Sequence, residues 1–497
     1  MFDLNKNEDE VIEYWKEHGI NAKVKERNKE GKKFYFLDGP PYATGELHPG
    51  QIWVKTIKDI FLRYRRFKGY DVHDRAGYDV HGLPVEHKVE SSLKLGSKRE
   101  IESRIGVENF IKDCKAYVDS LIPRMGADYK RFGISMDFDS AYIPYTRQYI
   151  ENAWKMLKSA HGKGLLYADL KPMLYCVHCE TVLAQGTLEV EYADDKDTAV
   201  FVAFRVDDKF SKARIQVDSQ TYLVIWTTTP WTLPSNMAIA VNPKDIYVKV
   251  ESNGRKLIIM KKRLDAVLGS IGESAVVEAE FYGSELEGIF YVSPLESKVP
   301  KQKEFRKYHR IVFSEEGVST EEGSGLVHIA PGHGFDDYNI GKTNGIPAFS
   351  PLDAHAAYTT DAGEYAGIKA PDDANVRIVS DLEALGFLLD RGSVTHSYPH
   401  CWRCSGKLIY VVTKQWFLNI SKIKSKLIKE NRKVSWHPAE AMGWQEEVLK
   451  NSPDWCISRQ RYWGIPIPIW SWYCCLLSAC VSSGQCIQMT KNTPRSG

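Results

Sequence analysis

Two Cys-x-x-Cys pairs constrain the fold of this chain more than any other feature of its sequence. The first pair is Cys176 and Cys179, the second is Cys401 and Cys404, and 222 positions separate the inner two cysteines. Two such turns supply four thiolates, which suit a tetrahedral zinc ion; free thiols are the alternative, and a redox pair lacks a thioredoxin-like context. A site closed by such distant pairs requires the chain to leave one domain, form a second and return.

The cysteine pairs therefore predict an inserted domain and its boundaries. We expect the first domain over residues 1–185, the insertion over 186–395 and the return to the first domain over 396–470. Segments such as TAVFVAFRV, YLVIWTTT and KLIIM predict a mostly β insertion. Residues 471–497 hold four of the ten cysteines with neither metal-site spacing nor helical periodicity, so we interpret them as an anomalous tail from a frameshift or a splicing error.

The stretch KFYFLDGPPYATGELHPGQIWVKTIKD, residues 33–59, changes its period part-way. Its apolar run at 34–37 predicts a short buried strand, the Gly/Pro-rich part a loop, and the residues from Ile52 an amphipathic helix. A helix N-terminus reached through such a loop suits a phosphate group, and His48 adds a donor beside it. A turn histidine with no chemical role is the alternative.

GPPYATGELHPGQ, followed by AGYDVHGLPVE at 76–86, resembles the nucleotide-binding fold of class I aminoacyl-tRNA synthetases. GYDVHGLPVE and RYWGIPIP are similar to isoleucyl-tRNA synthetases of the archaeal and eukaryotic type, and the likeness extends almost to residue 470. The resemblance implies an α/β protein, with a Rossmann-like nucleotide-binding catalytic domain interrupted by a mostly β (α+β) editing domain. It also implies isoleucine–tRNA ligase activity, with ATP and isoleucine as substrates, tRNA(Ile) as partner, and Mg²⁺ beside the phosphates in addition to Zn²⁺ at the cysteines.

The resemblance assigns the synthetic site to two loops and the returning segment. His48, Gly50 and Gln51 stand where the family has His-x-Gly-His, and Gln51 can donate a hydrogen bond but carries no charge. Asp79 matches the residue that pairs with the substrate's ammonium group; outside this context a loop aspartate is more typical of a helix cap. The implied substrate-binding residues are Pro41, Asp79, His81, Trp455 and Trp463, of which the two tryptophans are candidates for an aromatic wall or for core positions.

Two segments of the expected insertion, IWTTTPWTLPSN and GSGLVHIAPGHGFDDY, resemble the editing domain of isoleucyl-, valyl- and leucyl-tRNA synthetases. The resemblance implies that the threonines line a deacylation pocket and that Asp337, rather than its neighbour Asp336, holds the amino acid's ammonium group. Taken singly, threonines are typical of strands and aspartates of helix caps. The implied editing residues are Thr227, Thr228, Thr229, His328 and Asp337.

The composition permits this interpretation without arguing for it. The chain is 43% hydrophobic and 26% charged, as is ordinary for a soluble protein, and its formal charge of +2 does not indicate a nucleic-acid binder. The acidic N-terminus is no signal peptide, and no run of apolar residues is long enough to span a membrane. We therefore expect a cytoplasmic, monomeric protein.

Three alternatives to a complete isoleucine–tRNA ligase stay open. One is a valine–tRNA ligase, another is a fragment that retains only aminoacyl-tRNA deacylase activity, and the third is an inert, zinc-pinned fragment. The family's KMSKS-like lysine loop and anticodon-binding domain have no counterpart in the sequence. We therefore expect a truncated chain that activates isoleucine poorly.

Overall fold

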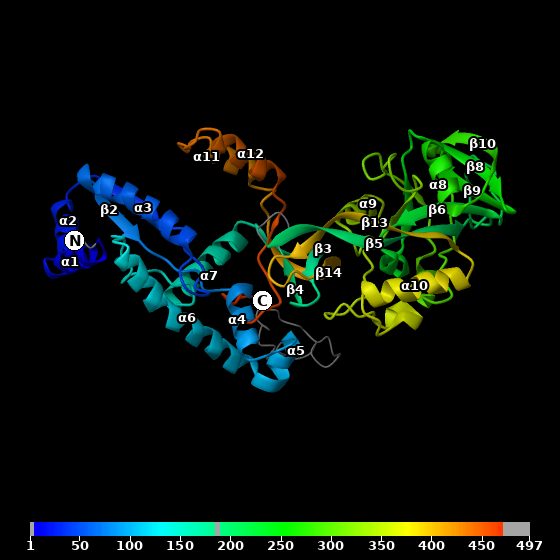
Figure 1. Cartoon of the computed structure of the whole chain (residues 1–497). Helices are drawn as coiled ribbons and strands as arrows, with labels where there is room; N and C mark the ends of the chain where they lie inside the picture. Colours follow the sequence, from blue (N-terminus) through cyan, green and yellow to red (C-terminus); the bar gives the residue numbers. More distant parts are fainter. Residues whose placement is uncertain (1–3, 184–188, 471–497) are drawn as a thin grey trace, which may run out of the picture. The chain divides into compact units, whose positions relative to one another are not determined.

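A computed structural model describes residues 4–183 and 189–470, and the chain divides into two compact units. One unit comprises residues 1–166 and 458–497, and the other comprises 167–457 (Figure 1). The predicted boundaries near 186 and 395 do not coincide with this division and stay predictions, and the predicted tail lies outside the described residues. No helix within the described ranges is both long and apolar enough to cross a bilayer.

The N-terminal unit is mainly helical around a small parallel sheet. Its two strands, β1 and β2, pair over five residues each. Its elements are α1 (Leu4–Glu17), α2 (Ile20–Arg27), β1 (Lys33–Leu37), α3 (Pro49–Phe67), β2 (Asp71–Arg75), α4 (Leu83–Ser92), α5 (Lys98–Glu100), a π-helical turn (Ile101–Ile105), α6 (Val107–Arg131) and α7 (Arg147–Gly162). The core of this unit includes Cys114, which is fully buried, as is common for a free cysteine.

Strand β1 forms where the sequence predicts a strand, but the prediction that it is buried is wrong. Tyr35 is 75% exposed and Leu37 is 86% exposed. Phe34 and Phe36 are partly buried against the core of this unit, so the apolar run has one covered face and one exposed face, and Tyr35 and Leu37 lie on the exposed one. The predicted Rossmann-like domain stays a prediction; among the described residues of this unit, β1 and β2 form a two-stranded parallel sheet.

Helix α3 follows the loop as predicted, but its buried residues include the charged Lys55, Asp59 and Arg66, and most of its apolar side chains other than Leu62 are exposed. Lys55 is 2% exposed, whereas Trp53 is 71% and Phe61 63% exposed. The Lys55 ammonium pairs with the buried carboxylate of Asp38, which follows β1. Because a buried charge is tolerated only when it is paired, this contact anchors α3 to the loop that precedes it.

The second unit is dominated by a nine-stranded sheet. The strand order is β10-β8-β9-β6-β12-β7-β11, with β5 pairing β6 and β13 pairing β5. Helix α8 lies beside β6, β8 and β9, against which it buries Val267 (Figure 1). The elements of the unit are β3 (Leu166–Cys176), β4 (Thr181–Leu183), β5 (Val190–Arg205), β6 (Thr221–Thr227), β7 (Ala238–Val241), β8 (Ile246–Ser252), β9 (Arg255–Met260), α8 (Leu264–Ile271), β10 (Val276–Tyr282), β11 (Ile311–Phe313), β12 (Val327–Ile329), α9 (Phe335–Thr343), α10 (Asp372–Ala384), β13 (Leu388–Cys401), β14 (Leu408–Leu418), α11 (Lys424–Asn431), α12 (Ala441–Asn451) and β15 (Trp455–Cys456). The mixture of sheets and helices agrees with the expected α/β class, and the alternating segments of the expected insertion are strands.

A long antiparallel ladder joins the nine-stranded sheet to a smaller one. Strands β5 and β13 pair from Val202 opposite Leu388 to Val190 opposite Cys401, whereas β5 pairs with β6 only from residue 200 onward. The four-stranded sheet, ordered β15-β14-β3-β4, lies at the cysteine end of this ladder. Both Cys-x-x-Cys pairs therefore occupy hairpin turns, one between β3 and β4 and the other between β13 and β14.

Candidate functional sites

The first turn of α3 holds the three residues predicted for catalysis. His48 is the N-cap: its Nδ1 accepts from the Gly50 N–H at 3.1 Å, and Gln51 Oε1 accepts from the His48 N–H at 2.9 Å. In a neutral imidazole whose Nδ1 accepts, the proton lies on Nε2. The exposed ring of His48 therefore presents an Nε2–H donor beside the positive end of a 19-residue helix, and Gln51 fixes the start of that helix.

The loops after β1 and β2 run side by side next to this helix start. The Asp79 N–H donates to the Pro41 carbonyl at 2.8 Å. Burial raises the pKa of Asp79, although hydrogen bonds from the His81 backbone and the Tyr42 hydroxyl act in the opposite direction. Burial lowers the pKa of His81 to about 4, and its ring lies edge-on to Trp463 with 5.3 Å between centroids. Four of the five predicted substrate-binding residues thus belong to one unit and lie in neighbouring segments.

Glu86, which the sequence analysis did not single out, binds the segment at 461–463 to the N-terminal unit. This buried carboxylate pairs with Arg461 and accepts from the N–H groups of Tyr462 at 2.8 Å and Trp463 at 2.6 Å. Its three partners come from a segment about 376 positions later in the chain. The sequence signal for this role was a glutamate directly after the apolar residues of GLPVE. A charged side chain buried beside such residues requires a partner, because an unpaired charge is rarely buried.

A pocket of about 330 Å³ brings together the predicted editing residues. It lies where β6 ends, beside β12 and the start of α9, because Val327 of β12 pairs with Trp226 of β6. Its polar lining includes Thr227, Thr228, Thr229, Thr232, His328 and Asp337.

A hydrogen-bonded chain runs from the threonines into the protein interior. His328 Nε2 lies 2.9 Å from Thr232 Oγ1, and His328 Nδ1 lies 2.8 Å from the amide nitrogen of Asn236. Burial lowers the pKa of His328 to about 3, so the ring is neutral at physiological pH. Thr232 and Asn236 were not singled out from the sequence, although both stand in the quoted IWTTTPWTLPSN segment.

Asp337 and its neighbour Asp336 differ in environment. Asp336 is exposed, whereas Asp337 is partly buried, lines the pocket and accepts from the Ala330 N–H at 2.8 Å. Burial raises the pKa of Asp337 to about 7. A cation entering the pocket would favour the ionised carboxylate and lower this pKa again.

The four cysteines of the two hairpin turns converge. Their Sγ atoms all lie within 4.8 Å of one another, and no other group of metal-ligand side chains occurs among the described residues. Four thiolates at about 2.3 Å from a zinc ion are about 3.8 Å apart, so this cluster fits such an ion with small adjustments. Cys176, Cys179 and Cys401 are buried, and none of the described cysteines forms a disulfide.

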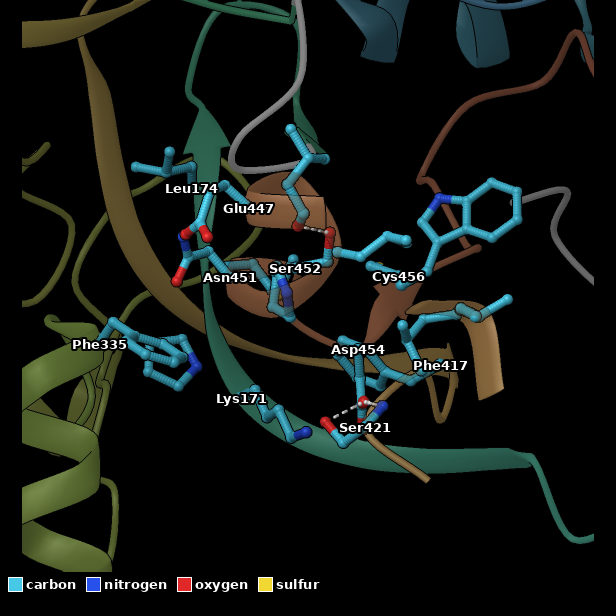
Figure 2. A pocket seen from close by; sticks show the side chains of 18 residues that line it. Lys171, Leu174, Phe335, Phe417, Ser421, Glu447, Asn451, Ser452, Asp454 and Cys456 are labelled. Atoms are coloured by element: carbon cyan, nitrogen blue, oxygen red, sulfur yellow. Dashed lines mark hydrogen bonds between the residues drawn. The ribbon is translucent and has the colours of Figure 1, made fainter. Parts of the chain in front are cut away.

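A larger cavity of about 830 Å³ lies elsewhere in the second unit (Figure 2). Asp454 lies at its wall and accepts from the Ser421 hydroxyl at 2.8 Å (Figure 2). It also accepts from the Tyr167 hydroxyl at 2.6 Å. Trp455, the second candidate for the aromatic wall, is 55% exposed and lines this cavity. Trp455 therefore belongs to a different unit from Asp79, His81 and Trp463.

The sequence of the chain matches a known protein family along almost its whole length. The sequence model described as tRNA synthetases class I (I, L, M and V) matches residues 10–475. The chain belongs to this family.

Curated relatives of this class I synthetase chain carry a more specific name. The isoleucine–tRNA ligase of Pyrococcus abyssi is 47% identical over 478 residues, covering 94% of this chain and 44% of the relative. That of Methanocaldococcus jannaschii is 42% identical over 473 residues, covering 93% of this chain and 44% of the relative. The chain thus spans less than half the length of these relatives.

Among solved structures, one match is a complex described as Agrobacterium radiobacter K84 agnB2 LeuRS-tRNA-LeuAMS. The matched region covers 96% of this chain and 52% of the protein chain in that complex. Its identity of 16% and TM-score of 0.37 are too low to support a structural or functional conclusion. The family assignment of this synthetase chain therefore depends on its sequence relatives.

Proposed function

We propose that this chain carries the amino-acid activation and editing parts of an isoleucine–tRNA ligase. The observation that carries the proposal is the identity of 41–47% to relatives named isoleucine–tRNA ligase over more than nine-tenths of the chain. The substrates would be isoleucine, ATP and tRNA(Ile). A valine–tRNA ligase is less favoured, because the eight relatives that support the assignment are all named isoleucine–tRNA ligase.

Activation joins the isoleucine carboxylate to the α-phosphate of ATP and releases pyrophosphate. Negative charge develops on the phosphoryl oxygens, so the protein contributes positioned donors, and Mg²⁺ would offset further charge. The His48 Nε2–H, which lies at the positive end of the α3 dipole, is such a donor. Asp79 would pair with the ammonium group of isoleucine, and Trp463 would cover its side chain next to His81.

Editing would remove valine, which is smaller than isoleucine by one methylene. Enzymes of this kind are known to discriminate such a pair by only about 10–200-fold in binding, a general value and no result of this structure. A second pocket that accepts valine can hydrolyse the wrong ester. Thr227, Thr228 and Thr229 would limit the side chain it admits, and Asp337 would hold the ammonium group.

Zinc is the metal that suits the four-cysteine cluster. When bound, it would cross-link the β3–β4 and β13–β14 turns and so hold the two ends of the intervening segment together. Its role would be structural, since four thiolates leave no open coordination position for a substrate.

Two assays on residues 1–497 test the proposal. Isoleucine should stimulate ATP–pyrophosphate exchange more than valine does, and Asp79→Asn should abolish the stimulation because the ammonium loses its charged partner. Faster exchange with valine would favour the valine enzyme instead.

The second assay measures hydrolysis of valine esterified to tRNA(Ile). Asp337→Ala should reduce the rate about 100-fold, because a charged contact to the substrate is lost, whereas Asp336→Ala, a matched change at the exposed neighbour, should leave it nearly intact. All lining residues of the pocket lie between 226 and 337. Hydrolysis without exchange would therefore support the deacylase-only alternative, and absence of both would support an inert fragment.

A further inference from the structure

The hydrogen bonds behind the 330 Å³ pocket have directions that the structure fixes. The Ala238 carbonyl can only accept, so the Asn236 Nδ2, 3.0 Å away, must face it. This orientation leaves Asn236 Oδ1 to accept from the Tyr291 hydroxyl at 2.7 Å. The second hydrogen on Nδ2 then points at His328 Nδ1, 2.8 Å away. His328 Nδ1 is therefore an acceptor and carries no proton.

The neutral ring of His328 must then carry its proton on Nε2. This Nε2–H donates to Thr232 Oγ1 at 2.9 Å, and the Thr232 hydroxyl donates onward to the Thr229 carbonyl at 2.8 Å. Because His328 is only 7% exposed and burial lowers its pKa to about 3, a second proton on the ring is strongly disfavoured.

The donor-to-acceptor direction of these hydrogen bonds extends to the hydroxyls of Thr227 and Thr229, where the distances are longer. Thr227 Oγ1 accepts from the Thr229 N–H at 3.1 Å and lies 3.2 Å from Thr229 Oγ1, which in turn lies 3.4 Å from Thr232 Oγ1. With the Thr232 proton committed to a carbonyl, the consistent arrangement has Thr227 donating to Thr229 and Thr229 donating to Thr232. The hydroxyl protons of Thr227, Thr229 and Thr232 are then used inside the chain of hydrogen bonds.

We propose that Asn236 is a positioning residue that holds His328 as the Nε2–H tautomer, so that Thr227 and Thr229 present oxygen lone pairs rather than protons to the pocket. The proposal deepens the editing function proposed above and rests on it. Lone pairs of Thr227 and Thr229 would accept the hydrogens of a bound water and turn its oxygen away from the threonines. In this arrangement His328 orders hydroxyl groups and is not a general base.

A second buried histidine provides an internal reference with the opposite tautomer. His333 Nδ1 lies 3.0 Å from the Tyr410 carbonyl, which can only accept, so the proton of His333 must lie on Nδ1. Its Nε2 then accepts from the Ser235 hydroxyl at 3.0 Å. The two rings should therefore differ in the same protein under the same conditions.

Nitrogen-15 NMR of the full chain labelled at histidine measures these tautomers directly, because protonated and bare ring nitrogens resonate in separate ranges. Spectra of His328→Gln and His333→Gln assign the two rings. We expect a bare Nδ1 and a protonated Nε2 for His328, and the reverse for His333. A protonated Nδ1 on His328 in the unaltered chain would overturn the proposal.

Two substitutions of the amide's surroundings separate tautomer control from simple loss of a contact. Asn236→Asp offers His328 Nδ1 an acceptor in place of a donor, so a proton should appear on Nδ1. Tyr291→Phe is the matched control: it removes a hydrogen bond to the same amide, but Ala238 still orients Nδ2, so the tautomer should persist. An unchanged tautomer in a folded Asn236→Asp chain would contradict the assignment, as would a changed one in Tyr291→Phe.

Hydrolysis of valine esterified to tRNA(Ile) connects the tautomer to activity. Asn236→Asp should lower kcat by about tenfold or more with little change in KM, because the water is misoriented while the ester still binds. Tyr291→Phe should lower kcat less. Equal kcat losses in the two variants would refute the positioning role. If the unaltered chain has the expected tautomers but no hydrolytic activity, the editing function fails and the tautomer assignment stands.

Discussion

At the scale of a single residue, Asp337 must be ionised to bind an ammonium group, yet its burial in the pocket disfavours the ionised form. A carboxylate that holds an ammonium group must be close to the charge it binds, and the pocket that surrounds it also removes water from it. Burial raises its pKa from the usual 3.8 to about 7, and hydrogen bonds from the backbone N–H groups of Ala330 and of Asp337 itself offset only part of this rise. An empty pocket therefore carries a cost in folding free energy that a cationic ligand would remove.

The pH dependence of that cost gives a prediction for Asp337→Asn. Between about pH 4 and pH 7 the unfolded chain loses this proton while the folded chain keeps it, so the stability of the unaltered protein falls as pH rises through this window. The amide has no such cost. Asp337→Asn should raise the melting temperature at pH 8 more than at pH 5, with a gain of about 1–2 kcal/mol at pH 8 after allowance for partial exposure.

Calorimetry at the two pH values measures the difference. Asp336→Asn serves as the comparison: its side chain is exposed and lies outside the pocket, and its charge contributes less than burial to the raised pKa of Asp337, so its gain at pH 8 should be smaller. A gain at pH 5 equal to that at pH 8 would mean that the carboxyl is not destabilised by its surroundings.

At the level of elements, helix α4 receives a segment that lies more than 370 positions later in the chain. Glu86 accepts hydrogen bonds from two backbone N–H groups and pairs with Arg461, which is only 5% exposed. The same arginine pairs with Glu90, one turn further along α4. The return of the chain to the N-terminal unit thus depends on a few buried polar contacts as well as on Trp463.

Glu86→Ala should therefore release the segment at 458–463. Removing one partner of a buried ion pair typically costs about 3–5 kcal/mol, because the other charge stays buried. We expect a lower melting temperature and faster tryptic cleavage after Arg459 and Arg461. Glu90→Ala removes a less buried partner of Arg461 and no acceptor for the backbone N–H groups, so it should lower the melting temperature less. A larger effect of Glu90→Ala than of Glu86→Ala would show that Glu86 does not hold the segment.

On the scale of the whole molecule, the four-cysteine cluster links turns that are far apart in the sequence. We expect about one zinc ion per chain, as four thiolates saturate a tetrahedral site. Cys401→Ser should lose the metal, lower the melting temperature and speed proteolysis near the β3–β4 and β13–β14 turns, because binding of a structural ion contributes to folding free energy.

Metal analysis with Cys456→Ser as the control separates metal loss from general destabilisation. Cys456 is buried in the same unit but is not part of the cluster, so its substitution should keep the zinc content unchanged. A metal-free unaltered chain, purified without chelators, would show that the cluster consists of thiols only.

The sequence by itself determined the family, the strand–loop–helix order within 33–59, strands in the expected insertion and the convergence of the cysteine pairs. These features could be predicted because they depend on the local periodicity of the sequence and on the ligand chemistry of closely spaced residues. The assignment of individual site residues stays a prediction, although Thr227, His328 and Asp337 do share one pocket.

Only the tertiary structure decided which faces are buried and which polar groups meet. Periodicity identified α3 but could not reveal that Lys55 is buried while Phe61 is exposed, because burial depends on the elements that pack around a helix. Glu86 acquires its role from partners that lie about 376 positions later in the sequence. Asn236 acquires its role from the Ala238 carbonyl, which orients its amide, and from the distant His328 and Tyr291. A hydrogen bond between such groups leaves no periodic trace, so its existence follows from the folded geometry alone.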